Sequence, residues 1–203
     1  MKETSAKPAL RISHIVYGRM AVKNRVHYLI DPKGKGSAHA APESVVLKRW
    51  RKRQFPNYTF SGSRLSSTLW RAVHQAFGDK LHQWVGRSAL DFAEHIKPKR
   101  VGLKKKGHLS LPSAEALYAL FMTCGLERLQ AIIARHTSTE HKGKSGVPDL
   151  FLFATNQTTC LPTIARFLEV KKPEEPASAV QLEEINYLNG LRLHARVIRL
   201  IEA

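Results

Sequence analysis

The sequence predicts an α/β fold, a small mixed β-sheet flanked by helices. Over the last sixty residues, apolar strand-like segments and one helical segment follow each other in the order strand, strand, helix, strand. This alternation is typical of α/β folds. Hydrophobic residues make up 43% of the 203 residues and charged residues 24%, a balance found in globular rather than disordered proteins. We therefore expect a packed core.

The first 110 residues are expected to form a basic, mainly helical part, 11–110, preceded by a flexible tail at 1–10. Short strands are predicted at 11–17, 25–30 and 57–61; a turn at 31–36 closes the second, and Gly62 follows the third. A helix is predicted to begin at Pro42 and Glu43, because proline followed by an acid is a typical helix start. Further helices are predicted at 64–78 and 80–96, followed by a basic loop with two glycines at 97–107.

The remaining segment, 111–203, is expected to form a distinct part. Helical spacing of apolar residues runs from Ser113 to His136, with a break at Gly125. Strands are predicted at 147–153 and 165–172, a helix at 178–189 and a closing strand at 195–200. The loop between the first two strands is short, so these strands are expected to pair.

The net charge of +17 lies entirely in the first half of the chain. Residues 1–110 hold 23 Lys and Arg residues against 6 Asp and Glu residues, whereas residues 111–203 hold 10 of each. Such asymmetry indicates a polyanionic partner, and nucleic acid is favoured because basic side chains release counterions from its phosphates. The alternative is a solvated basic surface that only aids solubility.

Composition also narrows the class of protein and its location. No run approaches the ~18 uncharged apolar residues of a membrane span, so no membrane partner is expected. The two cysteines, Cys124 and Cys160, are too few for a disulfide scaffold or a cysteine-built zinc site. They fit a reducing compartment, and a cytoplasmic location is predicted.

Three polar residues near the two predicted strands form a candidate catalytic site. Side chains alternate along a strand, so Glu169 and Lys171 are expected to point to the same face. Asp149 opens the preceding strand, and pairing of the two strands would bring it beside Glu169. Two carboxylates next to a lysine at a sheet edge are typical of a site for a hard divalent cation such as Mg²⁺.

These residues suggest phosphodiester hydrolysis by in-line attack of water. Asp149 and Glu169 would be metal ligands, and the main-chain carbonyl of Val170 a third. Lys171 would help to orient and deprotonate the attacking water, or offset negative charge in the transition state. The non-catalytic alternatives are that Asp149 only shapes a turn, and that Glu169 and Lys171 form an exposed ion pair that contributes little to stability.

The ordered set of Asp149 after Val147 and Pro148, then Glu169-Val170-Lys171, then Gln181 resembles the VRR-NUC branch of the PD-(D/E)XK nuclease superfamily. The resemblance implies a restriction-endonuclease-like core, with 111–203 as the catalytic core and Mg²⁺ or Mn²⁺ as cofactor. It also gives Gln181 a catalytic or positioning role. The alternative for Gln181 is purely structural, because Ser178 and Gln181 have the spacing of a helix capping box.

A weaker resemblance links residues 43–77 and 124–136 to the nuclease module of the Fanconi-associated nucleases. The family places a metal-binding glutamate where this chain has Ser61, and Glu43 and Glu115 are the candidate replacements. The resemblance implies a DNA nuclease acting on branched or flapped DNA in repair. An antibacterial effector that nicks DNA is an equally favoured alternative. Such an effector would be delivered into the cytoplasm of a target cell and would have an immunity protein as partner.

The alternative to an enzyme is a catalytically degenerate DNA-binding module, which the serine at position 61 suggests. A homodimer is implied by resemblance only. In either case the basic residues of two segments are expected to contact DNA: Lys48, Arg49, Arg51, Lys52, Arg53, Lys97, Lys99, Arg100, Lys104, Lys105 and Lys106.

Overall fold

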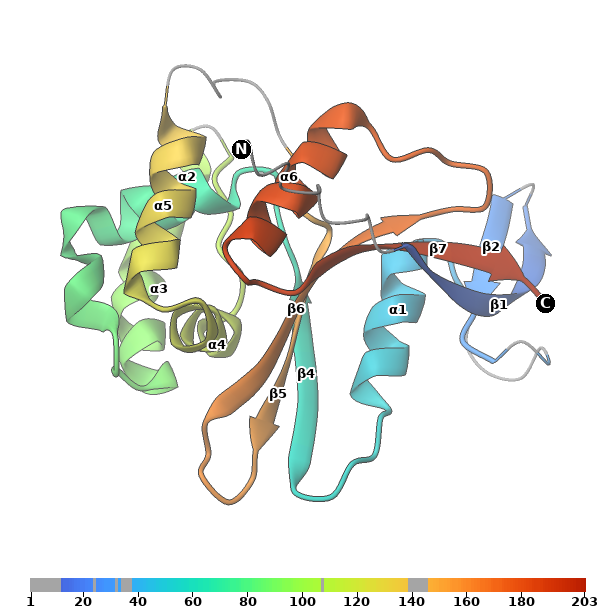
Figure 1. The fold of residues 1–203 in the computed structure, drawn as a ribbon, viewed down its shortest axis with the longest axis horizontal. Helices are drawn as coiled ribbons and strands as arrows, with labels where there is room; N and C mark the ends of the chain where they lie inside the picture. The colour runs from blue at the N-terminus through green and yellow to red at the C-terminus, as the bar shows by residue number, and fades with distance from the viewer. Residues whose placement is uncertain (1–11, 24, 32, 34–37, 107, 139–145) are drawn as a thin grey trace, which may run out of the picture.

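The computed structural model describes residues 12–23, 25–31, 33, 38–106, 108–138 and 146–203. Their centre is a mixed β-sheet with strand order β3-β2-β1-β7-β6-β5-β4 (Figure 1). The strands are β1 (Ile12–Val22), β2 (Arg25–Leu29), β3 (Ala38–His39), β4 (Tyr58–Arg64), β5 (Leu150–Asn156), β6 (Pro162–Lys171) and β7 (Ala195–Glu202). The α/β prediction is confirmed, while the predicted tail at 1–10 lies outside the described residues.

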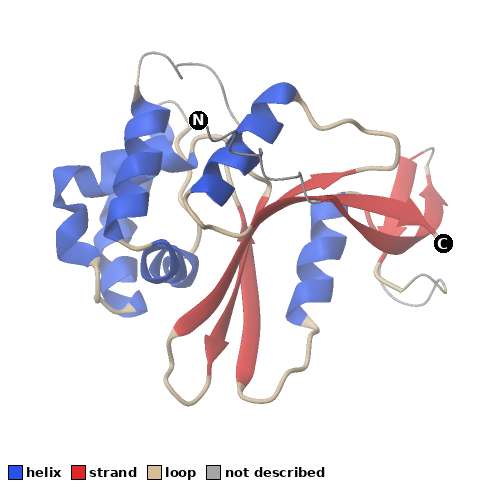
Figure 2. Cartoon of the chain, viewed as in Figure 1, coloured by secondary structure: helices blue, strands red, loops and turns tan. Residues whose placement is uncertain are grey.

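Helices flank this sheet on both sides (Figure 2). They are α1 (Pro42–Arg51), α2 (Leu69–Phe77), α3 (Ala89–Lys105), α4 (Ala114–Cys124), α5 (Leu126–Thr137) and α6 (Ala179–Gly190), with a 3-10 segment η1 (Gly78–Trp84) after α2. α1 carries proline in its first turn, as predicted. Gly125 separates α4 from α5 with a positive φ of 75°, a conformation that suits glycine and explains the predicted break.

The sheet joins strands from both halves of the chain. β1 runs parallel to β7, and β6 also runs parallel to β7. β4 pairs antiparallel with β5, and β5 with β6. Because 11–110 and 111–203 contribute neighbouring strands, the predicted boundary near residue 110 does not divide the sheet.

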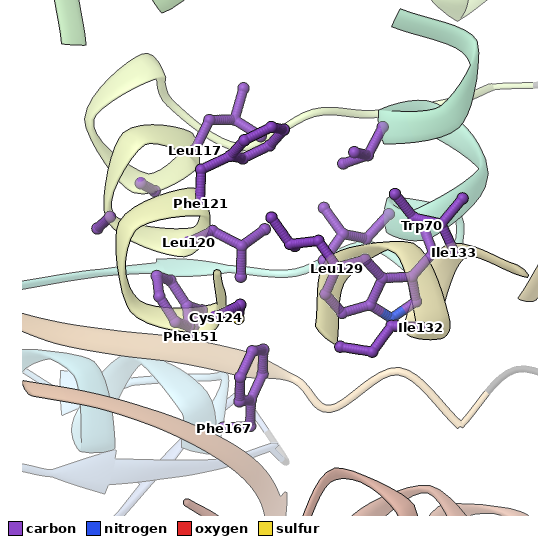
Figure 3. Close-up of a cluster of buried hydrophobic side chains, with 14 of the residues drawn as sticks. Trp70, Leu117, Leu120, Phe121, Cys124, Leu129, Ile132, Ile133, Phe151 and Phe167 are labelled. Atoms are coloured by element: carbon purple, nitrogen blue, oxygen red, sulfur yellow. The ribbon is translucent and has the colours of Figure 1, made fainter. Parts of the chain in front are cut away.

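Side-chain alternation along the strands gives the sheet two apolar faces. Phe151 and Phe167 point to one face, where they pack against α2, α4, α5 and α6 in the larger core cluster (Figure 3). Leu150 and Leu168 point to the other face, which is covered by α1 through residues such as Val45. Figure 1 shows α1 on the opposite side of the sheet from α6. Strands buried on both faces account for the near-continuous apolar runs in the sequence.

The prediction of a basic loop at 97–107 is wrong, because α3 continues through Pro98 to Lys105. Tertiary contacts hold this extension in place. Leu103 is buried, and Lys99 and Arg100 donate hydrogen bonds to the main-chain oxygens of Ala76 and Pro112. These contacts offset the backbone hydrogen bond that proline removes from a helix.

No single described helix is long and apolar enough to cross a bilayer. α4 and α5 reach the necessary length and hydropathy only when taken together, and the chain bends by 108° between them.

Candidate active site

Asp149 lies immediately before β5, where two main-chain contacts fix it. The N–H of Val170 donates a 2.8 Å hydrogen bond to Asp149 Oδ2, and the N–H of Leu65 donates to the Asp149 carbonyl oxygen at 2.8 Å. The loop before it packs tightly on α6, because a Cβ added at Gly146 would lie 2.7 Å from the Val180 carbonyl oxygen. Glycine at this position therefore lets the loop approach the helix.

Glu169 lies beside Asp149 because β5 and β6 pair as predicted. Leu150 is opposite Leu168 in the antiparallel register, so Asp149, which precedes Leu150, lies beside Glu169, which follows Leu168. Glu169 is only 2% exposed. Its Oε1 accepts hydrogen bonds from Lys171 Nζ at 2.9 Å and from Gln181 Nε2. The predicted grouping of these residues is thus observed.

Gln181 makes two contacts, one that caps α6 and one with Glu169. Its side-chain oxygen accepts the Ser178 N–H at 2.9 Å, which completes a capping box at the start of α6. Its amide nitrogen donates to Glu169. The cap therefore fixes the amide in the orientation that holds the Glu169 carboxylate.

Lys171 has a second acidic partner that the sequence pattern did not reveal. Glu175 Oε1 lies 3.4 Å from Lys171 Nζ, and its other oxygen accepts the Lys172 N–H at 3.2 Å. The Glu175 main-chain oxygen accepts a hydrogen bond from Arg199 on β7. Lys171 is 5% exposed and held between two carboxylates.

The electrostatics of the site follow from burial of these charges. Burial, and then the charge of Asp149, raise the pKa of Glu169 to about 7. Burial also raises the pKa of Asp149, against the opposing effect of the Val170 hydrogen bond. Burial alone would lower the pKa of Lys171, but the hydrogen bond and charge of Glu169 outweigh it and raise that pKa. Lys171 is therefore protonated at neutral pH.

Glu43, at the start of α1, is a third acid near the site. Its negative charge is among the causes that raise the pKa of Asp149. Its Oε2 lies 3.5 Å from Arg64 Nη2. Arg64 is opposite Leu150 in the β4–β5 pair, and this places the Glu43–Arg64 pair at the Asp149 end of the sheet. Arg64 was not singled out from the sequence.

Ser61 and Glu115, the other two positions considered for the family's metal-binding glutamate, lie away from the acidic pair. Ser61 is opposite Phe153, three residues along β5 from Leu150 and so about 10 Å from the acidic end. Its carbonyl oxygen accepts the Trp50 indole N–H. Glu115 is exposed on α4, and its charge is not among those that act on Asp149 or Glu169. The structure therefore favours Glu43 over Glu115.

The chemistry of the donors fits a hard divalent cation. Asp149 and Glu169 are adjacent carboxylates whose mutual repulsion raises the pKa of Glu169, and a cation between them would relieve that repulsion. Within the described residues, no group of three or more His, Cys, Asp or Glu side chains is arranged to hold a metal ion. The Val170 carbonyl remains a predicted third ligand, and its N–H is already engaged by Asp149.

The residues predicted to contact DNA do not form one patch. Lys48, Lys52 and the other residues of 48–53 lie at the end of α1, whereas Lys104, Lys105 and Lys106 lie exposed at the end of α3, well separated from α1 in Figure 1. Several of the predicted side chains also bind the protein itself. Arg49 donates to the Ile30 oxygen and Arg51 to the Gly62 oxygen, and Lys99 and Arg100 hold the end of α3. Lys97 is exposed.

Comparisons with known proteins identify a family and a shared fold. Residues 108–199, which include Asp149, Glu169, Lys171 and Gln181, match the family model of the VRR-NUC domain. The resemblance found in the sequence is confirmed. No match was found among curated proteins.

Two solved structures share the fold. Crystal structures of paFAN1 bound to DNA with a 1-nucleotide or a 2-nucleotide 5′ flap and a gap each give a TM-score of 0.54, with 14% and 13% sequence identity. Each comparison covers 98% of this chain and 39% of the other chain. This chain therefore spans about two fifths of their length. The likeness confirms the restriction-endonuclease-like α/β fold.

Proposed function

We propose that this protein is a metal-dependent nuclease that hydrolyses phosphodiester bonds in DNA. The observation that carries the proposal is the group formed by the partly buried Asp149 and the buried Glu169 and Lys171, fixed at one end of the sheet within the segment that matches the VRR-NUC domain. The paFAN1 structures are complexes with 5′-flap DNA, so flap DNA is the first substrate to test.

The acidic pair would hold Mg²⁺ or Mn²⁺. When bound, a divalent cation supplies Lewis-acid stabilisation of the charge that develops on the phosphate. The chain's own residues prepare this position. The Val170 N–H fixes one oxygen of Asp149, and Gln181 and Lys171 fix Oε1 of Glu169.

Lys171 acts on the reacting phosphate as a positive charge. In the hydrolysis, a water oxygen forms a bond to phosphorus while the bond to the leaving oxygen breaks; the water loses a proton to solvent, and the leaving oxygen gains one from solvent. Because its pKa is raised, Lys171 is charged at neutral pH and is not the base that takes this proton. Its ammonium can instead orient the water and offset charge on the phosphate oxygens.

The test compares two adjacent lysines. Lys171→Gln removes the buried ammonium, and Lys172→Gln removes its exposed neighbour as the matched control. Each protein is incubated with 5′-flap DNA and with plasmid, in Mg²⁺, Mn²⁺ or EDTA. We expect cleavage by wild type and Lys172→Gln, and a loss of about 10²-fold or more in Lys171→Gln, the size typical of a removed electrostatic stabiliser.

Two outcomes would contradict the proposal. Equal cleavage by wild type and a folded Lys171→Gln protein would remove the site from the reaction. Salt-dependent DNA binding by wild type without cleavage in either metal would indicate a catalytically degenerate binding module instead. A cytoplasmic location, an immunity partner and a homodimer stay predictions from the sequence.

A further inference from the structure

A second candidate site lies on the face of the sheet that α1 covers. It is a pocket of about 470 Å³. Its floor is apolar and includes Leu152 on β5, Leu168 on β6 and Ile198 on β7. Pockets for small ligands commonly have volumes of about 300–1,000 Å³. The pocket is therefore large enough for more than a single ion.

Four arginines surround this floor. Arg166 and Arg196 project from the neighbouring strands β6 and β7, on the same face as Leu168. Arg49 lies on α1, and Arg53 follows its end with its guanidinium 4.8 Å from the Trp50 ring centre. We refer to these four residues and the floor between them as the arginine pocket.

Positive charge in the arginine pocket is not balanced by the protein. In the part of the chain that the structure describes, no ion pair joins an acid to Arg53, Arg166 or Arg196. Asp31 acts electrostatically on Arg49. Burial, and then the charges of Arg196 and Arg53, lower the pKa of Arg166. Arg166 and Arg196 are half-buried and Arg53 is exposed, and cations that repel one another in this way favour an anionic ligand.

We propose that the arginine pocket binds a phosphate group carried by a nucleoside. Guanidinium groups bind phosphate oxygens through paired hydrogen bonds, so several arginines around one space suit a phosphate better than a single carboxylate. The apolar floor and the volume beyond the guanidiniums suit an attached sugar and base. The source of the phosphate is either a free nucleotide or a nucleic-acid strand.

The arginine pocket is separate from the acidic pair. Glu169 and Lys171 point to one face of β6, and Arg166 and Leu168 point to the other. Arg166 also precedes Glu169 by three residues, about 10 Å along the strand. Its proposed role therefore does not depend on DNA cleavage, and it can be tested without divalent ions.

The experiment measures ligand binding by titration calorimetry in EDTA. The probes are deoxyadenosine 5′-monophosphate, inorganic phosphate, deoxyadenosine and a short single-stranded oligonucleotide. The variant Arg166→Gln/Arg196→Gln removes two guanidiniums from the pocket, and Arg71→Gln, on the exposed side of α2, is the matched control. Arg53→Gln, which changes an exposed residue, is a second test that leaves the sheet intact.

We expect wild type and Arg71→Gln to bind the nucleotide more tightly than inorganic phosphate or deoxyadenosine. The double variant should bind it at least tenfold more weakly, because each charged hydrogen bond contributes about a tenfold change or more. Its melting temperature should not fall, since like charges have been removed. Tighter binding of the oligonucleotide would assign the pocket to a strand, and exclusive binding of the nucleotide would assign it to a free ligand.

The proposal is overturned if neither the double variant nor Arg53→Gln weakens nucleotide binding. It is also overturned if deoxyadenosine binds as tightly as its phosphate, because the guanidiniums would then have no part in recognition.

Discussion

Replacing Asp149 with asparagine should stabilise the metal-free protein while it abolishes metal binding. Glu169 is buried beside the partly buried Asp149, and the charge of Asp149 adds to burial in raising the pKa of Glu169 from an ordinary 4.5 to about 7. Asparagine keeps an oxygen that can accept the Val170 N–H. The substitution therefore removes the repulsion and preserves the local fold.

The size of the effect follows from the pKa of Glu169. A change of one pH unit in a pKa corresponds to about 1.4 kcal/mol. Burial is the larger cause of the raised value and persists in the variant, and partial solvent screening weakens the rest. We expect a gain of about 1 kcal/mol in the free energy of unfolding at pH 8, which for a chain of this size corresponds to about 2–4 °C in Tm.

The sign depends on pH in a defined way. A carboxyl whose pKa is raised by folding binds its proton more tightly in the folded state, so wild-type stability falls as pH rises from about 4.5 through about 7. At pH 5 the pair already shares a proton, and the difference between variant and wild type should shrink. Thermal unfolding of wild type and Asp149→Asn in EDTA measures this stability difference at pH 5 and at pH 8. A variant less stable than wild type at pH 8 would refute the reasoning.

Three further predictions concern the metal, the sheet and the DNA contacts. Binding of Mg²⁺ or Mn²⁺ should strengthen as pH rises to about 7 and then level off, because the cation must displace the Glu169 proton. Calorimetry in buffers of different ionisation enthalpy measures this proton release, and an affinity independent of pH would contradict the prediction. Gly62→Ala should lower the free energy of unfolding by about 1–3 kcal/mol, because the added Cβ would lie 2.7 Å from Leu152 Cδ2 and 2.9 Å from the Phe151 oxygen. Gly102→Ala, in open space on α3, is the control and should be neutral or slightly stabilising. Chemical denaturation of both variants measures the two changes. Replacing the exposed Lys104, Lys105 and Lys106 with glutamine should weaken DNA binding and leave metal affinity unchanged. The slope of the logarithm of the binding constant against the logarithm of salt concentration should become shallower by about 0.9 for each phosphate that is no longer neutralised. An unaltered slope would mean that these lysines do not touch phosphate.

Much of the second half of the fold could be predicted from local sequence. The short loop between β5 and β6 required their strands to pair, and pairing fixed Asp149 beside Glu169. The spacing of Ser178 and Gln181 located the start of α6. These features depend on residues close together in the chain, which is why a single sequence reveals them.

Features that depend on distant residues could not be predicted in this way. The path of α3 through Pro98 depends on contacts with Ala76 and Pro112. The Glu43–Arg64 pair needs α1 and β4 to meet at the end of β5. Glu175 is only four residues from Lys171, but its loop is held by a hydrogen bond from the distant Arg199 on β7. In each case tertiary packing, rather than local preference, decides the position.

The parallel pairing of β1 with β7 has a consequence for how the chain folds. Residues 12–17 pair with residues 197–202, so the sheet gains its full width only after nearly the whole chain is available. Contacts between residues so distant in sequence require a large loss of chain entropy before they form, and they slow folding. A ribosome-bound chain that still lacks β7 would leave one side of β6 unpaired, next to Glu169 and Lys171. Assembly of the acidic end is thereby coupled to the arrival of β7.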